Sequence, residues 1–114
     1  MIIFLHNPRC SKSREALKLI EESNRKYILR EYLKNPLDFE ELLELQSKLW
    51  MKAIEFTRTK EKEFKDSLLN KNSTDEKILK AMSKFPKLME RAIVYDEKKA
   101  VLCRPPENIL EFLK

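Results

Sequence analysis

Apolar and polar residues alternate in blocks along the first third of the chain, and these blocks predict three elements. Ile2–Leu5 is a short apolar run that ends at an Asn-Pro pair, so we expect a buried strand there. Apolar residues recur at helical spacing within Ser11–Glu22, with lysines and glutamates on the other face, which predicts an amphipathic helix. Tyr27–Glu31 is rich in β-forming residues and predicts a second strand.

The middle of the chain has helical patterns. Asp38 and Glu41 have the spacing of a capping box and mark the start of a helix. One face of this helix is expected to consist of Phe39, Leu42, Leu43 and Gln46. Trp50–Asn72 is expected to form one helix or several helical fragments. Ser73 and Glu76 repeat the capping-box spacing at the start of the next helix.

Two short β-prone segments organise the last third of the chain. We expect the helix that follows Ser73 to stop at Pro86, because proline does not continue a helix. Ala92–Tyr95 and Lys99–Leu102 are separated by three charged residues and predict a β-hairpin. Pro105-Pro106 suits the first turn of a final helix.

The resulting order of elements predicts an α/β protein. A strand, a helix and a second strand at the start favour a parallel βαβ unit, and the hairpin adds an antiparallel edge. We therefore expect a four-stranded mixed sheet, with the helices of the middle segment between the second and third strands. A chain of 114 residues has the size of one domain, so residues 1–114 are expected to form a single domain.

Composition narrows the classes of function. The chain has 24 Lys and Arg against 19 Asp and Glu, a net charge of +5, but the two signs are interleaved. Nucleic-acid-binding proteins more often gather basic residues in a stripe, so we expect attraction for small anions and no nucleic-acid partner. No apolar run is long enough for a membrane span or a signal peptide, so we expect no membrane partner and a cytoplasmic location.

The small numbers of glycine, cysteine and histidine residues argue against several kinds of site. The chain has no glycine, which argues against a Gly-rich phosphate loop and leaves its tight turns to Asn, Asp, Lys or Pro. Two cysteines in a reducing compartment are not expected to form a structural disulfide. One histidine and two distant cysteines lack the spacing of a structural zinc site, so we expect no bound metal.

Cys10 lies where the first strand ends and the first helix is predicted to start. Backbone N–H groups are unpaired at a helix N-terminus, and the helix dipole favours negative charge there, which stabilises a thiolate and attracts an oxyanion. Arg9, Lys12 and Arg14 add positive charge. A free cysteine is more often a buried hydrophobe, but the polar neighbours of Cys10 favour a reactive and partly exposed thiol.

Two further residues have alternative interpretations. His6 is the only histidine, and either it orients or helps to ionise Cys10, or it ends the first strand and bonds the backbone. Cys103 follows the last predicted strand, and we interpret it as core filling in preference to a resolving thiol for Cys10.

Three arginines are candidate oxyanion ligands. A planar guanidinium binds tetrahedral oxyanions through paired hydrogen bonds. Arg91 precedes the hairpin and Arg104 follows it, and strand ends of such a sheet converge near the start of the first helix. Arg58 lies in a polar helical stretch. Surface charge is the alternative explanation for each arginine taken alone.

Three segments resemble one protein family. His6–Arg14, with the sequence HNPRCSKSR, is similar to the active-site segment of the glutaredoxin-linked arsenate reductases, the ArsC family, and is nearest to the branch with an NPRCSKS motif. Agreement continues at Pro86–Arg91 and at Leu102–Pro106. The ordered set of three segments is much more specific than the first motif alone, and the resemblance covers nearly the whole chain.

The resemblance implies a thioredoxin-like fold with a helical insertion, and a reductase of arsenate or a similar oxyanion. It implies that Cys10 attacks arsenate and that glutathione, as a co-substrate, displaces the adduct. Glutaredoxin would then reduce the mixed disulfide, with no bound cofactor. The family's oxyanion-binding arginines match Arg58, Arg91 and Arg104. His6 and Ser13 match family positions near the cysteine, and Ser13 is expected to help lower the pKa of the thiol.

Ala92 departs from the family pattern. The family usually has proline here, after the second arginine, where thioredoxin-like folds place a cis peptide beside the cysteine. A cis bond before a non-proline residue costs about 2.5–4 kcal/mol. We therefore expect either a trans Arg91–Ala92 bond or a strained cis bond.

Two alternative functions remain at this point. One is a glutathione-linked thiol oxidoreductase that does not act on arsenate. The other is an Spx-like regulator that binds RNA polymerase. Spx proteins resemble this chain in fold and usually carry a Cys-x-x-Cys switch, whose second position is Ser13 here.

Overall fold

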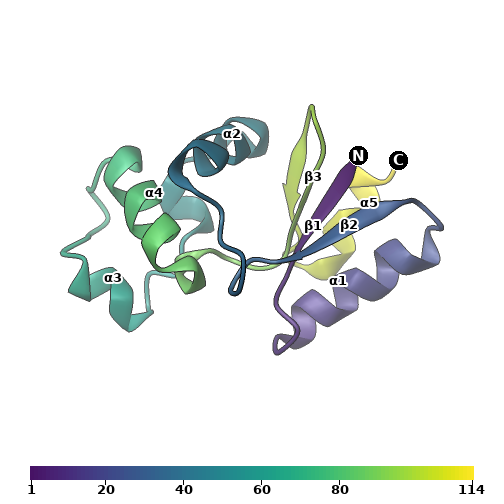
Figure 1. The fold of residues 1–114 in the computed structure, drawn as a ribbon, viewed down its shortest axis with the longest axis horizontal. Helices are drawn as coiled ribbons and strands as arrows, with labels where there is room; N and C mark the ends of the chain where they lie inside the picture. The colour runs from purple at the N-terminus through teal and green to yellow at the C-terminus, as the bar shows by residue number, and fades with distance from the viewer. The chain divides into compact units, whose positions relative to one another are not determined.

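The computed structural model describes all of residues 1–114, which divide into two compact units (Figure 1). The sheet unit comprises Met1–Asn35 and Arg91–Lys114, and the helical unit comprises Pro36–Glu90. The elements of the sheet unit are β1 (Ile2–His6), α1 (Ser11–Glu22), β2 (Tyr27–Glu31), β3 (Ile93–Tyr95), β4 (Ala100–Leu102), the 3₁₀ helix η3 (Pro106–Asn108) and α5 (Ile109–Phe112). The single domain expected for residues 1–114 stays a prediction.

The sheet has four strands in the order β2-β1-β3-β4. β1 and β2 are parallel, whereas β1 with β3 and β3 with β4 are antiparallel. The expected α/β architecture with a mixed sheet is therefore confirmed. Leu5 pairs with Ile93, and Ile93 pairs with Leu102. The C-terminal ends of β1 and β4 thus lie at the same end of the sheet as the start of β3.

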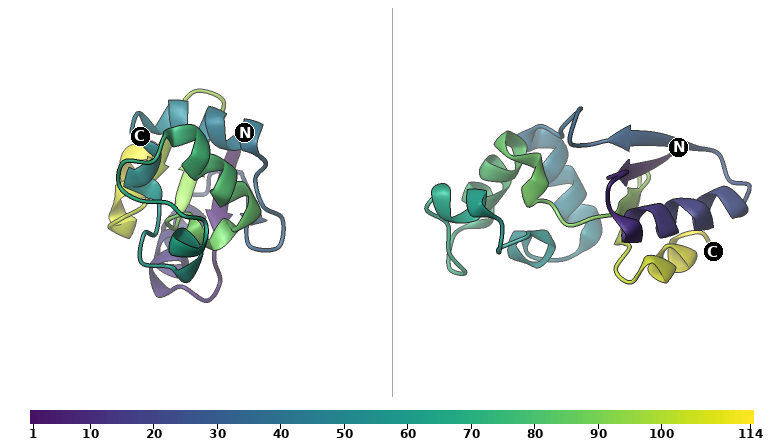
Figure 2. Two further views of the ribbon diagram at one scale, coloured as in Figure 1. Left: turned by 90° about the vertical axis from the view of Figure 1, so that its left-hand side faces the viewer. Right: turned by 90° about the horizontal axis from the view of Figure 1, so that it is seen from below.

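The core of the sheet unit lies on one face of the sheet. Side chains of a strand alternate between the two faces, and Ile2 and Phe4 of β1 face α1 and α5. Both helices lie on the same side of the strands (Figure 2, right). The buried cluster consists of Ile2, Phe4, Ala16, Ile20, Ala92, Val94, Cys103, Ile109 and Phe112. Their burial anchors α1, and with it the turn that precedes α1.

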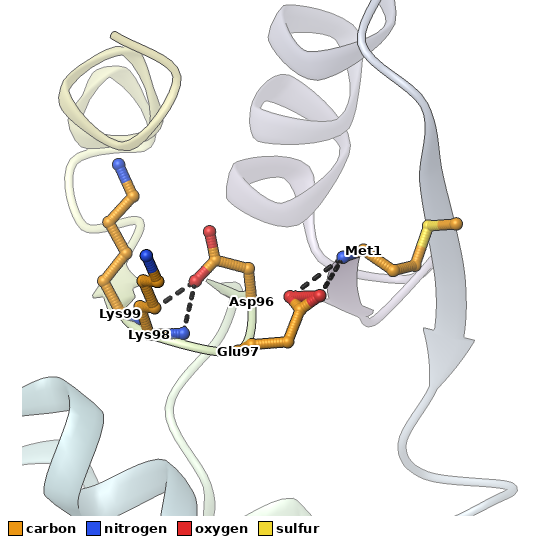
Figure 3. A network of polar contacts seen from close by, with 5 residues as sticks. All are labelled: Met1, Asp96, Glu97, Lys98 and Lys99. Atoms are coloured by element: carbon orange, nitrogen blue, oxygen red, sulfur yellow. Dashed lines mark hydrogen bonds and ion pairs between the residues drawn. The ribbon is translucent and has the colours of Figure 1, made fainter.

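A carboxylate shapes the turn between β3 and β4, where the chain has no glycine. Asp96 Oδ1 accepts hydrogen bonds from the backbone N–H groups of Lys98 at 2.8 Å and Lys99 at 2.9 Å (Figure 3). Burial would raise the pKa of Asp96, but these two N–H groups outweigh it and hold the pKa below its usual value. The neighbouring Glu97 binds the α-amino group of Met1, with 2.8 Å between Oε2 and the nitrogen.

The helical unit is inserted between β2 and β3, as expected. Its elements are α2 (Phe39–Leu49), the 3₁₀ helix η1 (Ala53–Phe56), α3 (Lys62–Asp66), α4 (Asp75–Lys84) and the 3₁₀ helix η2 (Pro86–Leu88). α4 packs against α2, η1 and η2. The capping box of Asp38 and Glu41 at the start of α2 is confirmed. None of the helices in the protein is both long and apolar enough to cross a membrane.

Two details of the helical unit differ from the sequence-based prediction. The N-cap of α4 is Thr74, whose Oγ1 accepts from the N–H of Lys77. The helix therefore begins one residue later than predicted, and the capping box of Ser73 and Glu76 does not form. The hydroxyl of Ser73 instead accepts from the N–H of Asn70 at 2.9 Å, within the turn that precedes the helix. The next hydroxyl along the chain caps α4.

The buried face of α2 also differs from the predicted face. Leu42, Leu45 and Leu49 are buried, whereas Leu43 is 39% exposed. The three buried leucines follow each other at three and four residues, which places them on one stripe of the helix. Leu43 is rotated by about 100° from Leu42 and lies outside this stripe.

Backbone conformations that favour glycine occur at three positions of this glycine-free chain. Asn24, Trp50 and Leu68 have φ values of 60°, 57° and 59°. Asparagine was an expected turn residue, but Trp50 and Leu68 were not, so the prediction that tight turns use only Asn, Asp, Lys or Pro is wrong. A left-handed conformation costs an ordinary residue about 1–2 kcal/mol.

Two peptide bonds are cis, and both lie near strand ends of the sheet unit. They are Arg91–Ala92 and Arg104–Pro105. Of the two conformations considered for the Arg91–Ala92 bond, the structure has the cis form.

Candidate active site

The turn after β1 delivers Cys10 to the start of α1. The carbonyl oxygen of Asn7 accepts from the N–H of Cys10 at 3.0 Å, and its side-chain oxygen accepts from the N–H of Arg9 at 3.0 Å. The carbonyl of Cys10 accepts from the N–H of Arg14, also at 3.0 Å, which begins the helical hydrogen-bond pattern. Cys10 is therefore the N-cap residue of α1, as the sequence predicts.

The surroundings of Cys10 favour its thiolate. Burial alone would raise the pKa of the thiol, but the backbone N–H groups of Ser13 and Lys12 and the guanidinium of Arg91 outweigh it and lower the pKa. As a thiol, the side chain makes no capping hydrogen bond. The unpaired N–H groups of the first helical turn thus remain available to the ionised sulfur.

Ser13 is a fully buried residue that ties the turn to β1. Its hydroxyl oxygen accepts from the N–H of Asn7 at 3.0 Å and lies 2.7 Å from Nδ1 of His6. Its contribution to the thiolate comes from its backbone N–H, not from its hydroxyl. The side chain of Ser13 thus holds the turn, while its backbone faces the sulfur.

His6 is buried at the end of β1, and its ring bonds the side chain of Ser13. This partner differs from both interpretations of the sequence, which considered Cys10 and the backbone. Burial lowers the pKa of His6; Arg14 lowers it further, and Glu31 and Glu21 oppose the shift only in part. His6 is consequently neutral near neutral pH and acts on the turn through Ser13.

Positive side chains surround the turn on its exposed side. Arg9, Lys12 and Arg14 are all exposed. Nη1 of Arg14 donates to the carbonyl of Pro8 at 2.8 Å, which braces the turn from outside. Lys12 lies 3.9 Å from Glu15, too far for a strong ion pair on an exposed helix.

The pairing register brings Arg91 and Arg104 to the same end of the sheet as the Cys10 turn. The N–H of Cys103 donates to the carbonyl of Ala92 at 2.8 Å, which continues the β3–β4 pairing by one residue. Arg91 and Arg104 are the next residues in this register. The contact between Arg91 and the Cys10 thiolate shows that this end of the sheet meets the start of α1.

Arg91 has one donor that the protein leaves without an acceptor. Its Nε is buried and has no hydrogen-bond partner. A buried donor without an acceptor costs about 1–3 kcal/mol. An oxyanion beside Cys10 would supply the missing acceptor. Arg104 is exposed and takes part in interactions of its own.

Arg58 belongs to the helical unit and is engaged by carboxylates. Its Nη1 lies 2.9 Å from Oε1 of Glu61, and its Nε lies 3.8 Å from Oε1 of Glu90. Neither partner was predicted from the sequence. The spacing of three residues between Arg58 and Glu61 was a signal for the first pair, but no local signal connects Arg58 with Glu90.

Cys103 is a residue of the core. It is fully buried within the cluster beneath the sheet, and its burial raises its pKa to about 12, against the smaller opposing effect of the Val94 backbone. The interpretation of Cys103 as core filling is confirmed. No disulfide is present between the two cysteines. The protein also contains no group of three or more histidine, cysteine or acidic side chains that could hold a metal ion.

These features define a class of protein. A sheet of order β2-β1-β3-β4, with a cysteine of lowered pKa at the N-terminus of the first helix, is the arrangement of thioredoxin-like thiol proteins.

Comparison with known proteins gives the family. The ArsC family profile matches residues 5–112, and the chain belongs to this family. The protein YfgD of Escherichia coli is 43% identical over 95% of this chain and 92% of its own length. An arsenate reductase of Haemophilus influenzae is 38% identical over 98% of both chains. The solved structure of an arsenate reductase from Vibrio cholerae has a TM-score of 0.89 and 37% identity, covering 96% of this chain and 95% of the other.

Proposed function

We propose that this protein reduces arsenate or a similar tetrahedral oxyanion, with Cys10 as the nucleophile. The observation that carries the proposal is the meeting of Cys10 and Arg91 at one end of the sheet. The thiolate is stabilised there by the N-terminus of α1 and by the guanidinium. The same groups attract an oxyanion, and the buried Nε of Arg91 is a donor in need of an acceptor. The arsenate reductases among the relatives support the choice of substrate.

The first step forms a bond between the Cys10 sulfur and arsenic. The thiolate attacks arsenic(V), and one arsenate oxygen takes up protons and leaves as water. Negative charge on the remaining oxygens is stabilised by Arg91 and by the N–H groups of α1. Arsenic keeps its oxidation state in this step.

The second step transfers two electrons to arsenic. The sulfur of glutathione attacks the Cys10 sulfur, a disulfide bond forms, and the electron pair of the sulfur–arsenic bond stays on arsenic. Arsenite leaves, and the thiol group of glutaredoxin reduces the mixed disulfide to regenerate Cys10. An external thiol is required because Cys103 is fully buried and protonated, with a pKa of about 12.

The remaining residues have supporting roles in this proposal. Arg104 binds the oxyanion from the neighbouring strand end. Arg58, a residue of the helical unit, is a candidate oxyanion ligand through the family resemblance alone. His6 and Ser13 hold the turn that carries Cys10, and Arg14 braces it from outside. No bound cofactor takes part.

The test is a coupled assay with the purified protein, arsenate, glutathione, glutaredoxin, glutathione reductase and NADPH. We expect arsenate-dependent oxidation of NADPH that disappears in Cys10→Ser and persists in Cys103→Ala, which changes the other cysteine.

Two results would count against the proposal. Turnover that survives in Cys10→Ser would exclude the nucleophile. Glutathione-dependent reduction of a disulfide substrate without any turnover of arsenate would instead support a thiol oxidoreductase that does not act on arsenate.

A further inference from the structure

Electric charge is divided unevenly between the two units. The sheet unit has 13 lysines and arginines against 8 aspartates and glutamates, so it carries the whole net charge of +5. The helical unit has 11 residues of each sign and is neutral. The unit that contains Cys10 therefore attracts anions through its own field.

Two of the cations beside Cys10 help to build the turn that carries it. Nη1 of Arg14 donates to the carbonyl of Pro8 at 2.8 Å, so the charged group of Arg14 itself braces the turn. Arg9 contributes through its backbone N–H, which donates to Oδ1 of Asn7 at 3.0 Å. The turn does not depend on the guanidinium of Arg9, which is exposed to solvent.

Lys12 presents a second exposed charge close to the same sulfur. Its side chain is 64% exposed, and its only close carboxylate, that of Glu15, lies 3.9 Å away and is 55% exposed. A pair of this kind is weak in water. The ammonium of Lys12 and the guanidinium of Arg9 can therefore meet a ligand from solution without loosening the turn.

Both charges lie close enough to Cys10 to act on a reagent that approaches the sulfur. Arg9 is adjacent to Cys10 in the chain, and Lys12 lies in the first turn of α1. Consecutive Cα atoms are about 3.8 Å apart, so each charge is on the order of 10 Å from the sulfur, which is about one Debye length at 0.1 M salt.

We propose that Arg9 and Lys12 select the thiols and disulfides that react with Cys10, and that they favour anionic partners over neutral and cationic ones. This inference rests on the proposed role of Cys10 as a nucleophile, and it adds the chemical class of the second substrate. Glutathione belongs to this class, because its carboxylates outnumber its amino group.

Thiol–disulfide exchange isolates this selection from the chemistry of arsenate. The thiolate of Cys10 attacks one sulfur of a disulfide, a mixed disulfide forms, and the other half of the reagent leaves as a thiolate. Oxidised glutathione is a net anion, bis(2-hydroxyethyl) disulfide is neutral and cystamine is a cation. The fraction of Cys10 present as thiolate multiplies all three rate constants alike, so it cancels in their ratios.

The test compares Arg9→Gln, Lys12→Gln and the double variant, with the adduct of Cys10 followed by mass spectrometry. At about 0.1 M salt, each change should lower the rate constant of oxidised glutathione relative to the neutral disulfide by about twofold, and both together by about fourfold. The relative rate constant of cystamine should rise. At about 1 M salt, where the Debye length is about 3 Å, the variants should become alike.

Lys18→Gln is the matched control. Lys18 is an exposed lysine of the same helix, about 9 Å farther along α1 than Lys12, so its removal should change the ratios much less. An equal effect of Lys18→Gln would show that overall charge selects the partner, and it would overturn the assignment to Arg9 and Lys12.

The remaining outcomes separate this inference from the proposed function. Unchanged ratios in the double variant would overturn the inference, whereas arsenate turnover would then still support the proposed function. Altered ratios in a protein that does not reduce arsenate would support the inference and exclude arsenate as the substrate. A native Cys10 that reacts with none of the three disulfides would refute the nucleophile, and both proposals with it.

Discussion

Cys10 and Cys103 both follow strands of the same sheet, yet their surroundings have opposite effects on the thiol. Cys10 caps α1, beside unpaired backbone N–H groups and the guanidinium of Arg91, and its pKa is lowered. Cys103 lies in the apolar cluster between the sheet and its helices, where burial raises its pKa to about 12. Burial opposes ionisation at both sites, but only the first site has donors that outweigh it.

This difference separates a nucleophile from a packing residue. A thiolate needs donors that the fold has not already used, and a helix N-terminus supplies them. The apolar core supplies none, so Cys103 behaves as a small hydrophobic side chain. Four substitutions test this difference between the two cysteines.

The largest effect is expected from removal of the nucleophile. Cys10→Ser should lower arsenate turnover by about three orders of magnitude or more, because a serine hydroxyl is not ionised at this position. The coupled NADPH assay measures the loss. Circular dichroism should show an unchanged fold, because Cys10 makes no capping hydrogen bond that the change removes.

The second effect concerns the charge beside the thiolate. Arg91→Ala should raise the pKa of Cys10 and lower kcat/KM by about 10²–10³-fold, because it removes a donor to both the thiolate and the oxyanion. The pH dependence of Cys10 alkylation by iodoacetamide measures the pKa.

Two other arginine changes serve as comparisons. Arg91→Lys should keep part of the pKa shift but not the paired hydrogen bonds to the oxyanion. Arg25→Ala removes an arginine that donates to the carbonyl of Leu113, and it should leave the reactivity of Cys10 unchanged. An unchanged alkylation profile in Arg91→Ala would refute the role of Arg91.

A smaller effect is expected at Ser13. Ser13→Ala leaves the N–H of Asn7 and the ring of His6 without their partner, which should destabilise the protein by about 1–3 kcal/mol. Activity should fall by about three- to tenfold as the turn loosens. The pKa of Cys10 should stay low, because the N–H of residue 13 belongs to the backbone.

Urea unfolding and the alkylation profile together test the change at Ser13. Ser11→Ala, an exposed serine of the same helix, should change neither quantity. A pKa of Cys10 that rises in Ser13→Ala to the value of a free thiol would show that the hydroxyl acts on the sulfur directly.

The smallest effect on activity is expected at Cys103. Cys103→Ala should retain turnover and cost about 1–2 kcal/mol of stability through the small cavity it leaves. In the native protein this thiol stays protonated up to about pH 12, whereas in the unfolded chain it loses its proton near pH ~8.5.

This difference in pKa predicts a pH dependence of stability. Above pH ~8.5 the unfolded state binds fewer protons than the native state, so stability falls as pH rises, by up to about 1.4 kcal/mol per pH unit. Cys103→Ala should remove this part of the alkaline loss. Unfolding in urea between neutral and alkaline pH measures the free energy of unfolding of both proteins. If this free energy falls equally with pH in the native protein and in Cys103→Ala, the raised pKa of Cys103 is refuted.

Local patterns predicted several elements with their correct bounds. Ser11–Glu22 and Tyr27–Glu31 match α1 and β2, because hydrophobic periodicity depends on neighbouring residues alone. The position of Cys10 at the start of α1 followed from the same reasoning. Where a second hydroxyl competed for a role, as at Thr74, the pattern did not identify the one that caps the helix.

Contacts between distant residues could not be predicted from these patterns. Nothing in the local sequence connects Arg58 with Glu90, which meet because a β-bridge joins their backbone segments. The hydrogen bond between His6 and Ser13 likewise depends on where the turn places the first helical residues relative to the end of β1.

Local sequence patterns predicted the helices and strands, the cap position of Cys10, the charge around it and the order of the elements. The sequence also favoured Arg91 near Cys10 and Cys103 in the core, and the three-dimensional structure shows both. The contact of Glu90 with Arg58 and the bond between His6 and Ser13 came from the structure without any sequence signal. The physical reason is that periodicity and capping are settled within one or two helical turns. A pKa or an ion pair depends instead on which distant groups the sheet register and the packing bring together.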